Sequence, residues 1–315
     1  MTVATQKRRS IVAAASVLVG LLALTACGSG GTTQQTAGSK LLVVATTTQV
    51  ADFARQVGGA RVAVTQILKP NVDPHDYDPS PADIAAIGKA RIVVKNGVGL
   101  EKWLDQTISS AGFEGTVVDT SAGVTIRKGN GTDEEKAGDP HIWHNPLNVV
   151  TMSTDIEKAF EKADPQGATA YRANLGAYVN KLKALDADIT KKIDSLPAND
   201  RKLVTNHDAF GYYIDRYHLQ FVGSVIPSFD TSAELSGKDI QDLVAKIKAT
   251  GTKAIFSESS LPPKTAQTIA QAAGVKVEAG EDSLYGDTLG PAGSAGATYL
   301  QMEAHNTDVI VNALK

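Results

Sequence analysis

Two histidines, an acid and two prolines lie together in one short stretch of this chain. Residues 139–146 read Asp-Pro-His-Ile-Trp-His-Asn-Pro. Proline fixes φ and removes a backbone donor, so the stretch indicates a stiff loop. A stiff loop that carries imidazole and carboxylate groups is suited to fixing a metal ion, and His141 is its candidate ligand.

Three further segments carry candidate ligands. His75 lies in Asp-Pro-His-Asp-Tyr at 73–77, beyond a strand-like run that ends at Leu68, and His207 follows the strand-like run 203–205. Asp282 comes after the last strand-like run, 275–277. In open α/β sheets, ligands collect at the carboxyl ends of the strands. Since two of the four positions fall in each half of the chain, we expect one ion in a cleft between two lobes.

The elements that must position these side chains follow a repeated pattern. Short apolar runs alternate with helical patterns at 40–164 and again at 198–315, which predicts an α/β fold of two lobes with parallel sheets. Residues 99–110 are one of the expected helices, and Asn145 and Pro146 are expected to cap and begin another.

One long helix is expected between the lobes, at 165–197. Its largely apolar stripe consists of Tyr171, Leu175, Tyr178, Leu182, Leu185, Ile189, Ile193 and Leu196. The spacing of three and four residues is that of one helix face. We interpret it as a rigid helix that spans both lobes; a long surface helix on one domain is the alternative.

The first 26 residues have the features of a secretory signal peptide. Lys7, Arg8 and Arg9 precede an uncharged apolar run at 11–24. The sequence Leu-Thr-Ala-Cys at 24–27 resembles the lipobox of bacterial lipoproteins, in which the cysteine receives lipid; an incidental cysteine after an ordinary signal peptide is the alternative. Cys27 is the only cysteine, so the chain has no internal disulfide. Residues 27–39 are expected to form a flexible tether.

Composition limits the classes of function. The 315 residues include 42% hydrophobic and 21% charged residues, as in soluble globular proteins, and the length predicts two domains. A formal net charge of −3 does not favour nucleic-acid binding.

Taken together, these motifs resemble the solute-binding lipoproteins of zinc and manganese ABC transporters, the cluster A-I metal-binding family, over essentially the whole mature chain. The matching segments are 73–77, Asn-Gly-Val-Gly-Leu-Glu at 96–101, 139–143, His-Asp-Ala-Phe-Gly-Tyr at 207–212, Ser-Glu-Ser-Ser at 257–260, and Asp282. The resemblance implies that His75, His141, His207 and Asp282 coordinate the metal. It also implies two lobes bridged by a rigid helix.

The ligand chemistry favours Zn(II), with Mn(II) as the alternative. Three imidazoles and one carboxylate suit tetrahedral zinc, whereas manganese prefers more oxygen. Family members that favour manganese typically carry a glutamate at the position of His207. Many zinc members have a histidine-rich loop between the first two ligand segments, and here residues 125–138 contain no histidine.

Four further residues are candidates for supporting the site. Asp139 and Asp208 could orient ligand imidazoles by accepting their other N–H, or could be simple loop carboxylates or caps. His144 could be an alternative ligand, but the family motif favours a place behind the ligands or at the rim. Glu258, at the end of a strand that faces the cleft, is a weaker candidate for support.

The function implied is the extracytoplasmic binding component of an ABC importer. Such a protein would be a monomer, lipid-anchored to the outer face of the bacterial cytoplasmic membrane, and would deliver metal to a permease driven by an ATPase. A zinc hydrolase is disfavoured, because the chain has no His-Glu-X-X-His and four protein ligands would close the site. A surface adhesin that uses metal only for stability is the remaining alternative.

Overall fold

The computed structural model describes residues 40–129, 131 and 133–315. The expected signal peptide at 1–26, the lipidated Cys27 and the tether at 27–39 lie outside the described residues. Within the part that is described, no helix is long and apolar enough to cross a membrane.

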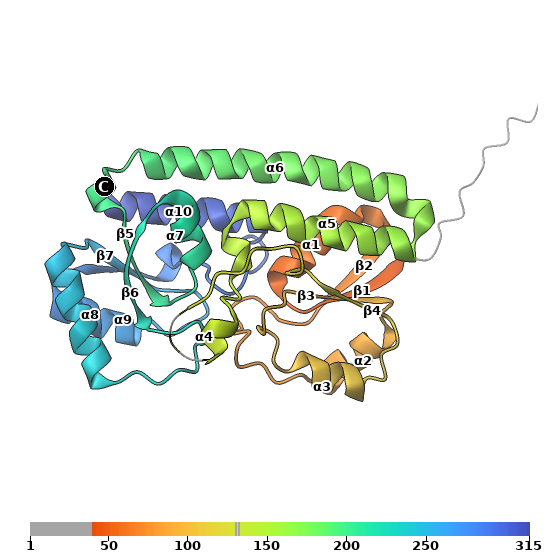
Figure 1. The fold of residues 1–315 in the computed structure, drawn as a ribbon, viewed down its shortest axis with the longest axis horizontal. Helices are drawn as coiled ribbons and strands as arrows, with labels where there is room; N and C mark the ends of the chain where they lie inside the picture. Colours follow the sequence, from red (N-terminus) through yellow and green to blue (C-terminus); the bar gives the residue numbers. More distant parts are fainter. Residues whose placement is uncertain (1–39, 130, 132) are drawn as a thin grey trace, which may run out of the picture. The chain divides into compact units, whose positions relative to one another are not determined.

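A parallel four-stranded sheet of order β2-β1-β3-β4 organises the first lobe (Figure 1). Its strands are β1 Leu41–Ala45, β2 Val62–Gln66, β3 Ile92–Lys95 and β4 Thr116–Asp119. Its helices are α1 Thr48–Gly58, α2 Pro81–Lys89, α3 Leu104–Ser110, α4 Asp133–Ala137 and α5 Pro146–Ala163. Short 3-10 turns lie at Gly59–Arg61 and Ile142–His144.

Local sequence signals fix where these helices begin. Ser80 forms a capping box with Asp83 at the start of α2, with Pro81 in the first turn. The Asn145 side chain accepts a hydrogen bond from Leu147 N, so α5 begins at Pro146 as expected.

The helix expected at 99–110 begins only at Leu104. The buried Glu101 carboxylate accepts hydrogen bonds from the backbone N–H groups of Asn96 and Gly97, at 2.6 and 3.1 Å. Those bonds hold residues 96–101 as a tight loop, so the helical spacing of the first apolar residues was misleading.

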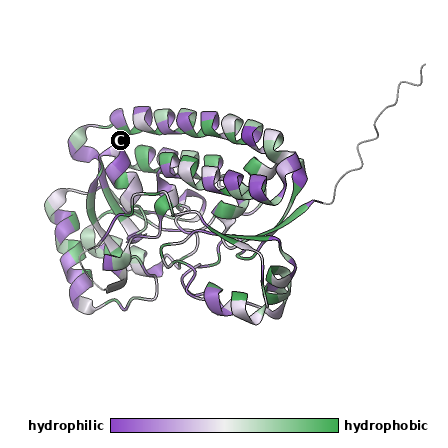
Figure 2. Ribbon diagram, turned by 45° about the vertical axis from the view of Figure 1, so that its right-hand side comes forward, coloured by the Kyte–Doolittle hydropathy of each residue, from purple (hydrophilic) through white to green (hydrophobic). Residues whose placement is uncertain are grey.

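Helix α6, Ala168–Asp194, passes over helices of both lobes (Figure 1). It packs on α1 and α5 of the first lobe and on α7 and α10 of the second. The turn at 165–167 is a 3-10 helix, so the α-helix begins three residues later than expected. Hydrophilic and hydrophobic residues alternate along α6 (Figure 2), and its buried residues include Tyr171, Leu182 and Ile193. The expected long helix between two α/β lobes is confirmed.

The second lobe repeats the parallel arrangement, with strand order β6-β5-β7-β8. Its strands are β5 Lys202–His207, β6 Gln220–Ile226, β7 Ala254–Phe256 and β8 Lys276–Glu278. Its helices are α7 Gly211–Tyr217, α8 Gly237–Thr250, α9 Lys264–Ala273 and α10 Tyr299–Leu314. Short 3-10 turns lie at Ala198–Asp200 and Gly280–Asp282.

The C-terminal segment links the two lobes. Tyr299 and Met302 at the start of α10 pack in the core of the first sheet, whereas Val309 and Ile310 at its other end pack in a core of the second. The lobe boundaries at 164 and 198 stay predictions, and α10 contributes to both cores.

Candidate metal centre

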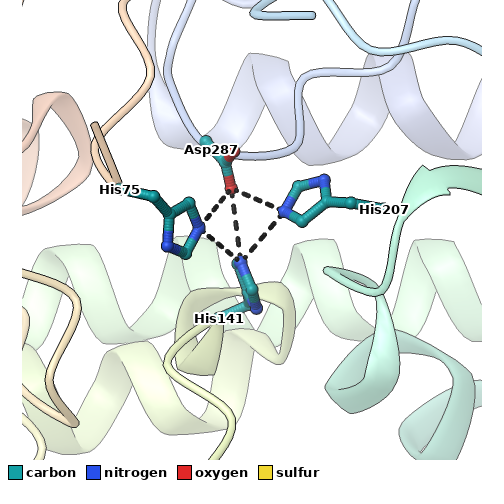
Figure 3. Close-up of side chains that lie close together, drawn as sticks. All are labelled: His75, His141, His207 and Asp287. Atoms are coloured by element: carbon teal, nitrogen blue, oxygen red, sulfur yellow. Dashed lines mark hydrogen bonds and ion pairs between the residues drawn. The ribbon is translucent and has the colours of Figure 1, made fainter. Parts of the chain in front are cut away.

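Three histidines and one aspartate meet between the two sheets (Figure 3). One ligand atom from each of His75, His141, His207 and Asp287 lies within 4.8 Å of the other three. His141 Nε2 is 3.3 Å from His75 Nε2 and 3.2 Å from His207 Nε2. Asp287 Oδ1 lies 3.9, 3.4 and 3.3 Å from the Nε2 atoms of His75, His141 and His207.

These spacings suit one small tetrahedral cation. Zn–N bonds of about 2.0–2.1 Å place the corners of a tetrahedron about 3.3 Å apart. Four of the five distances between ligand atoms given above are within a few tenths of an ångström of this value. The donor set is three imidazole nitrogens and one carboxylate oxygen, all with side chains at most 3% exposed. The cluster can therefore enclose a cation with little rearrangement.

Each member reaches the cluster from the carboxyl end of a strand. His75 lies between β2 and α2, and its backbone N donates to Asp73 Oδ1 at 2.9 Å. His141 lies between β4 and α5, just before the 3-10 turn. His207 is the last residue of β5 and not a loop residue as expected. The three histidines lie together, as the pattern of strands and loops predicted.

Asp282 does not join the cluster, and this expectation is corrected by the structure. It ends the turn Gly280–Asp282 after β8, is exposed, and lines a surface hollow together with Glu278 and His305. The chain then returns and runs beside β7, where Leu284 N donates to Ser257 O and Leu284 O accepts from Ser259 N. Only beyond Leu284 does the chain leave the sheet edge toward the histidines, so Asp287 takes the fourth place. Leu284, the one aliphatic residue in the polar stretch 280–288, was the signal that could have indicated this return.

Two of the histidines are oriented by carboxylates on their far side. Asp139 Oδ1 lies 2.8 Å from His141 Nδ1 and also accepts from His141 N. Glu258 Oε2 lies 2.8 Å from His207 Nδ1, and Glu258 Oε1 accepts from His207 N. A carboxylate that accepts the Nδ1 proton leaves Nε2 free to bind a metal and makes the ring more basic. Asp139 hydrogen-bonds to His141 Nδ1 in this way, whereas Glu258 lies 2.8 Å from His207 Nδ1 and hydrogen-bonds to the backbone N of His207.

Asp208 and His144 lie elsewhere than the cluster. Asp208, a candidate for orienting an imidazole, forms no hydrogen bond with one among the described residues. Its backbone N donates to Ser228 O, and burial together with the charge of Asp139 raises its pKa to about 6. His144 is fully buried, with Nδ1 2.8 Å from Glu303 Oε1 and Nε2 3.1 Å from Gly286 O. It is neither an alternative member of the cluster nor a rim residue.

The three imidazoles hold their protons with different strength. Burial lowers the pKa of His75 to about 3. Burial alone would also lower the pKa of His141, but hydrogen bonds to Asp139 and Asp287 outweigh it and raise the pKa to about 9. The charges of Asp287 and Glu258 likewise overcome burial and hold the pKa of His207 well above its usual value.

The acid of the cluster responds in the opposite direction. Burial would raise the pKa of Asp287, but the charge of His207 and the hydrogen bond with His141 hold it well below its usual range. The metal-free cluster is therefore an anionic carboxylate facing the protonated rings of His141 and His207, and an entering cation must displace those two protons.

A cavity of about 260 Å³ reaches His75. Its lining includes Val98 and Pro140 of the first lobe and Phe229 and Asp230 of the second. Lys102 Nζ lies 2.6 Å from Asp230 Oδ2 across this cavity. Through His75, this cavity borders the cluster.

Comparison with known proteins identifies the fold and the class of molecule. Residues 43–313 match the family model ZnuA, described as zinc-uptake complex component A, periplasmic. The chain is 34% identical over 305 residues to the manganese-binding lipoprotein MntA of Bacillus subtilis, covering 96% of this chain and 98% of that protein. It is 30% identical over 314 residues to the iron ABC transporter substrate-binding lipoprotein MtsA of Streptococcus pyogenes, covering 98% and 99%.

A solved structure has the same architecture. The periplasmic zinc-binding protein TroA of Treponema pallidum superposes with a TM-score of 0.80 at 31% identity, covering 88% of this chain and 99% of that one. These relatives are named for zinc, manganese and iron, so the metal in the name differs among proteins of this fold.

Proposed function

Because the chain belongs to the ZnuA family of substrate-binding components of metal ABC transporters, we propose that it captures Zn(II) outside the cytoplasmic membrane and delivers it to a permease. The family consists of solute-binding proteins and not of enzymes. The observation that carries the choice of zinc is the set of ligand atoms, three imidazole nitrogens and one carboxylate oxygen at tetrahedral spacing.

The proposed ligands are His75, His141, His207 and Asp287. Their net charge of −1 with neutral imidazoles leaves about +1 on a bound divalent ion, which Asp139 and Glu258 offset from behind two of the rings. Four protein ligands leave no position open for an activated water, which agrees with a carrier rather than a hydrolase.

Manganese is the second candidate, favoured by one feature of this chain and by its relatives. The loop 125–138 contains no histidine, and a relative at 34% identity is named for manganese binding. Mn(II) prefers oxygen ligands and higher coordination, and here the cluster offers one carboxylate.

Metal analysis of the purified protein tests the cargo. We expect zinc at one ion per chain, and zinc should displace manganese in competition, because affinities at a nitrogen-rich site follow the order Mn(II) below Zn(II). The measurement is elemental analysis after purification, followed by competition at equal metal concentrations. Retention of manganese against equimolar zinc would reject the proposed cargo and support the alternative.

Cys27 is proposed to carry the lipid anchor that holds the protein at the outer face of the cytoplasmic membrane. The signal pattern at 1–26 motivates this, as do relatives that are named lipoproteins. A Cys27→Ser variant, expressed from its own leader in a bacterial host, is expected in the soluble or secreted fraction, whereas the wild type should sediment with membranes. Equal membrane association of both proteins would argue against lipidation.

A further inference from the structure

A third buried histidine–carboxylate pair lies behind the metal cluster, and nothing in the capture of metal uses it directly. His144 Nδ1 lies 2.8 Å from Glu303 Oε1, and neither side chain has any exposed surface. His144 follows the loop of His141, whereas Glu303 lies on α10, 159 residues further along. Phe210 stacks on the imidazole with ring centroids 4.3 Å apart, which fixes the plane of the ring.

The other nitrogen of this histidine holds the residue that precedes Asp287. His144 Nε2 lies 3.1 Å from Gly286 O, and Trp143 Nε1 donates to the same oxygen at 3.1 Å. Since a carbonyl oxygen only accepts, His144 Nε2 must carry the proton of this bond. The position of the Gly286 carbonyl is thus set by two donors from the 142–144 turn.

The opposite side of Gly286 is closed as well. A Cβ added at this position would collide with Glu258 Oε2, the carboxylate oxygen that faces His207. On either side of it along the chain, Asn306 binds both backbone groups of Tyr285 at 2.9 Å, and Gln49 Nε2 donates to Asp287 O at 2.8 Å. The Asp287 loop is therefore held by contacts with Gln49 of the first lobe and Glu258 of the second.

A buried histidine–carboxylate pair is a costly way to hold a loop. Both groups lose their hydration on burial, and replacing a buried pair of this kind with apolar side chains of similar volume is often neutral or stabilising. Stability alone therefore does not account for this pair. Its bond to the residue before Asp287 gives it a second role, since a ligand held in place before the ion arrives spares the cost of ordering it.

We propose that His144 and Glu303 are a positioning pair that holds Gly286 and thereby presets Asp287 for metal capture. The pair acts through the backbone and does not touch the ion. This inference rests on the proposed metal site. It means that His144 and Glu303 affect metal affinity although neither is a ligand.

The test is the double variant His144→Leu/Glu303→Met, which replaces the pair with apolar side chains of similar size. We expect its Zn(II) affinity to fall about tenfold, the lower end of the range for groups that orient ligands, while the melting temperature of the metal-free protein stays equal or rises. Bound Co(II) should show altered visible absorption bands, because these report the geometry around the ion. A loss smaller than about threefold in Kd would overturn the proposal.

Three further proteins complete the design. Glu303→Gln is the rescue variant, because its amide N–H can donate to His144 Nδ1 while Nε2 keeps its proton for Gly286 O. Its metal affinity should stay near that of the wild type.

Asp186→Asn is the control variant and removes a different buried acid, which is bonded to Arg216 and Tyr217 in the second lobe. It should lower stability without changing Kd. If the double variant does not fold, the variant His144→Phe/Glu303→Gln replaces it, because it keeps an aromatic ring on Phe210. For this variant too, a loss smaller than about threefold in Kd would overturn the proposal.

The outcomes separate this inference from the proposed function. A wild-type protein that binds no metal tightly would remove the proposed function itself. A wild type that binds tightly, together with a folded double variant of equal affinity, would remove only the positioning role.

Discussion

Replacing Asp287 with alanine is expected to weaken Zn(II) binding by about 10²–10³-fold. A structural zinc site contributes about 10–16 kcal/mol through four ligands, which is roughly 2.5–4 kcal/mol for each one. Among the residues that the structure describes, Asp287 is the carboxylate that contacts all three imidazoles, at 3.3 to 3.9 Å. Its loss leaves the ion without a charged ligand. Competition against a chromophoric chelator at pH 9 measures the change.

Asp282→Ala is the matched control for this experiment. The two acids are five residues apart in the same connection between β8 and α10, but Asp282 is exposed and lies outside the cluster. Its replacement should leave Kd within about twofold of the wild type. An equal or larger effect at Asp282 would mean that the connection rearranges when metal binds and that the cluster described above is not the ligand set.

The carboxylates behind the histidines should give an intermediate result in the same series. Glu258→Gln and Asp139→Asn keep the shape of the side chains and remove the charges that orient His207 and His141. Losses of about 10–100-fold are expected for such partners. A graded series from Asp282 through these two to Asp287 would assign ligands and supports independently of the choice of metal.

Local sequence signals were sufficient for most of the fold. The alternation of strand and helix patterns, the Asn145-Pro146 helix start and the apolar stripe of α6 each depend on residues close together in the chain. Parallel sheets then require that loops after the strands meet at one edge, which brought His75, His141 and His207 together in the prediction.

What the sequence did not reveal depends on contacts between distant residues. The choice between Asp282 and Asp287 is made by the pairing of Leu284 with Ser257 and Ser259 beside β7, a detour that spacing alone does not encode. The pairing of His144 with Glu303 joins segments 159 residues apart, so neither sequence context indicated it. Asp208 is adjacent to His207 in sequence, but side chains alternate along an extended chain, so Asp208 is turned away from the cluster.

Lowering the pH from 9 to 6 is expected to weaken Zn(II) binding by about one to two powers of ten per pH unit. With an unperturbed pKa of about 6.5, histidine ligands would lose affinity only below that value. Here the pKa of His141 is about 9 and that of His207 is also raised, so each proton displaced adds about a tenfold change per pH unit. His75, with a pKa of about 3, contributes nothing in this window.

Two measurements count these protons. Chelator competition at pH 6, 7, 8 and 9 gives the slope, and calorimetry at pH 7 in buffers of different ionisation enthalpy gives the protons released per ion. Asp139→Asn removes a hydrogen bond that raises the pKa of His141, so its slope should flatten at a lower pH than in the wild type. Affinity that is constant between pH 7 and 9 would contradict the charge arrangement derived for the cluster.

Protonation of these histidines stabilises the metal-free protein and opposes the binding of metal. Folding raises the pKa of His141 from about 6.5 in the unfolded chain to about 9. Its protonation therefore stabilises the folded state fully at a pH below 6.5, and this stabilisation is lost as the pH rises through about 9. The metal-free protein should therefore melt at a lower temperature at pH 9 than at pH 6.5. Binding removes those protons, so the gain in melting temperature on adding zinc should increase over the same range. Thermal scans of both forms at the two pH values check this, and a zinc-induced gain that shrinks with rising pH would show that the cluster binds metal without giving up protons.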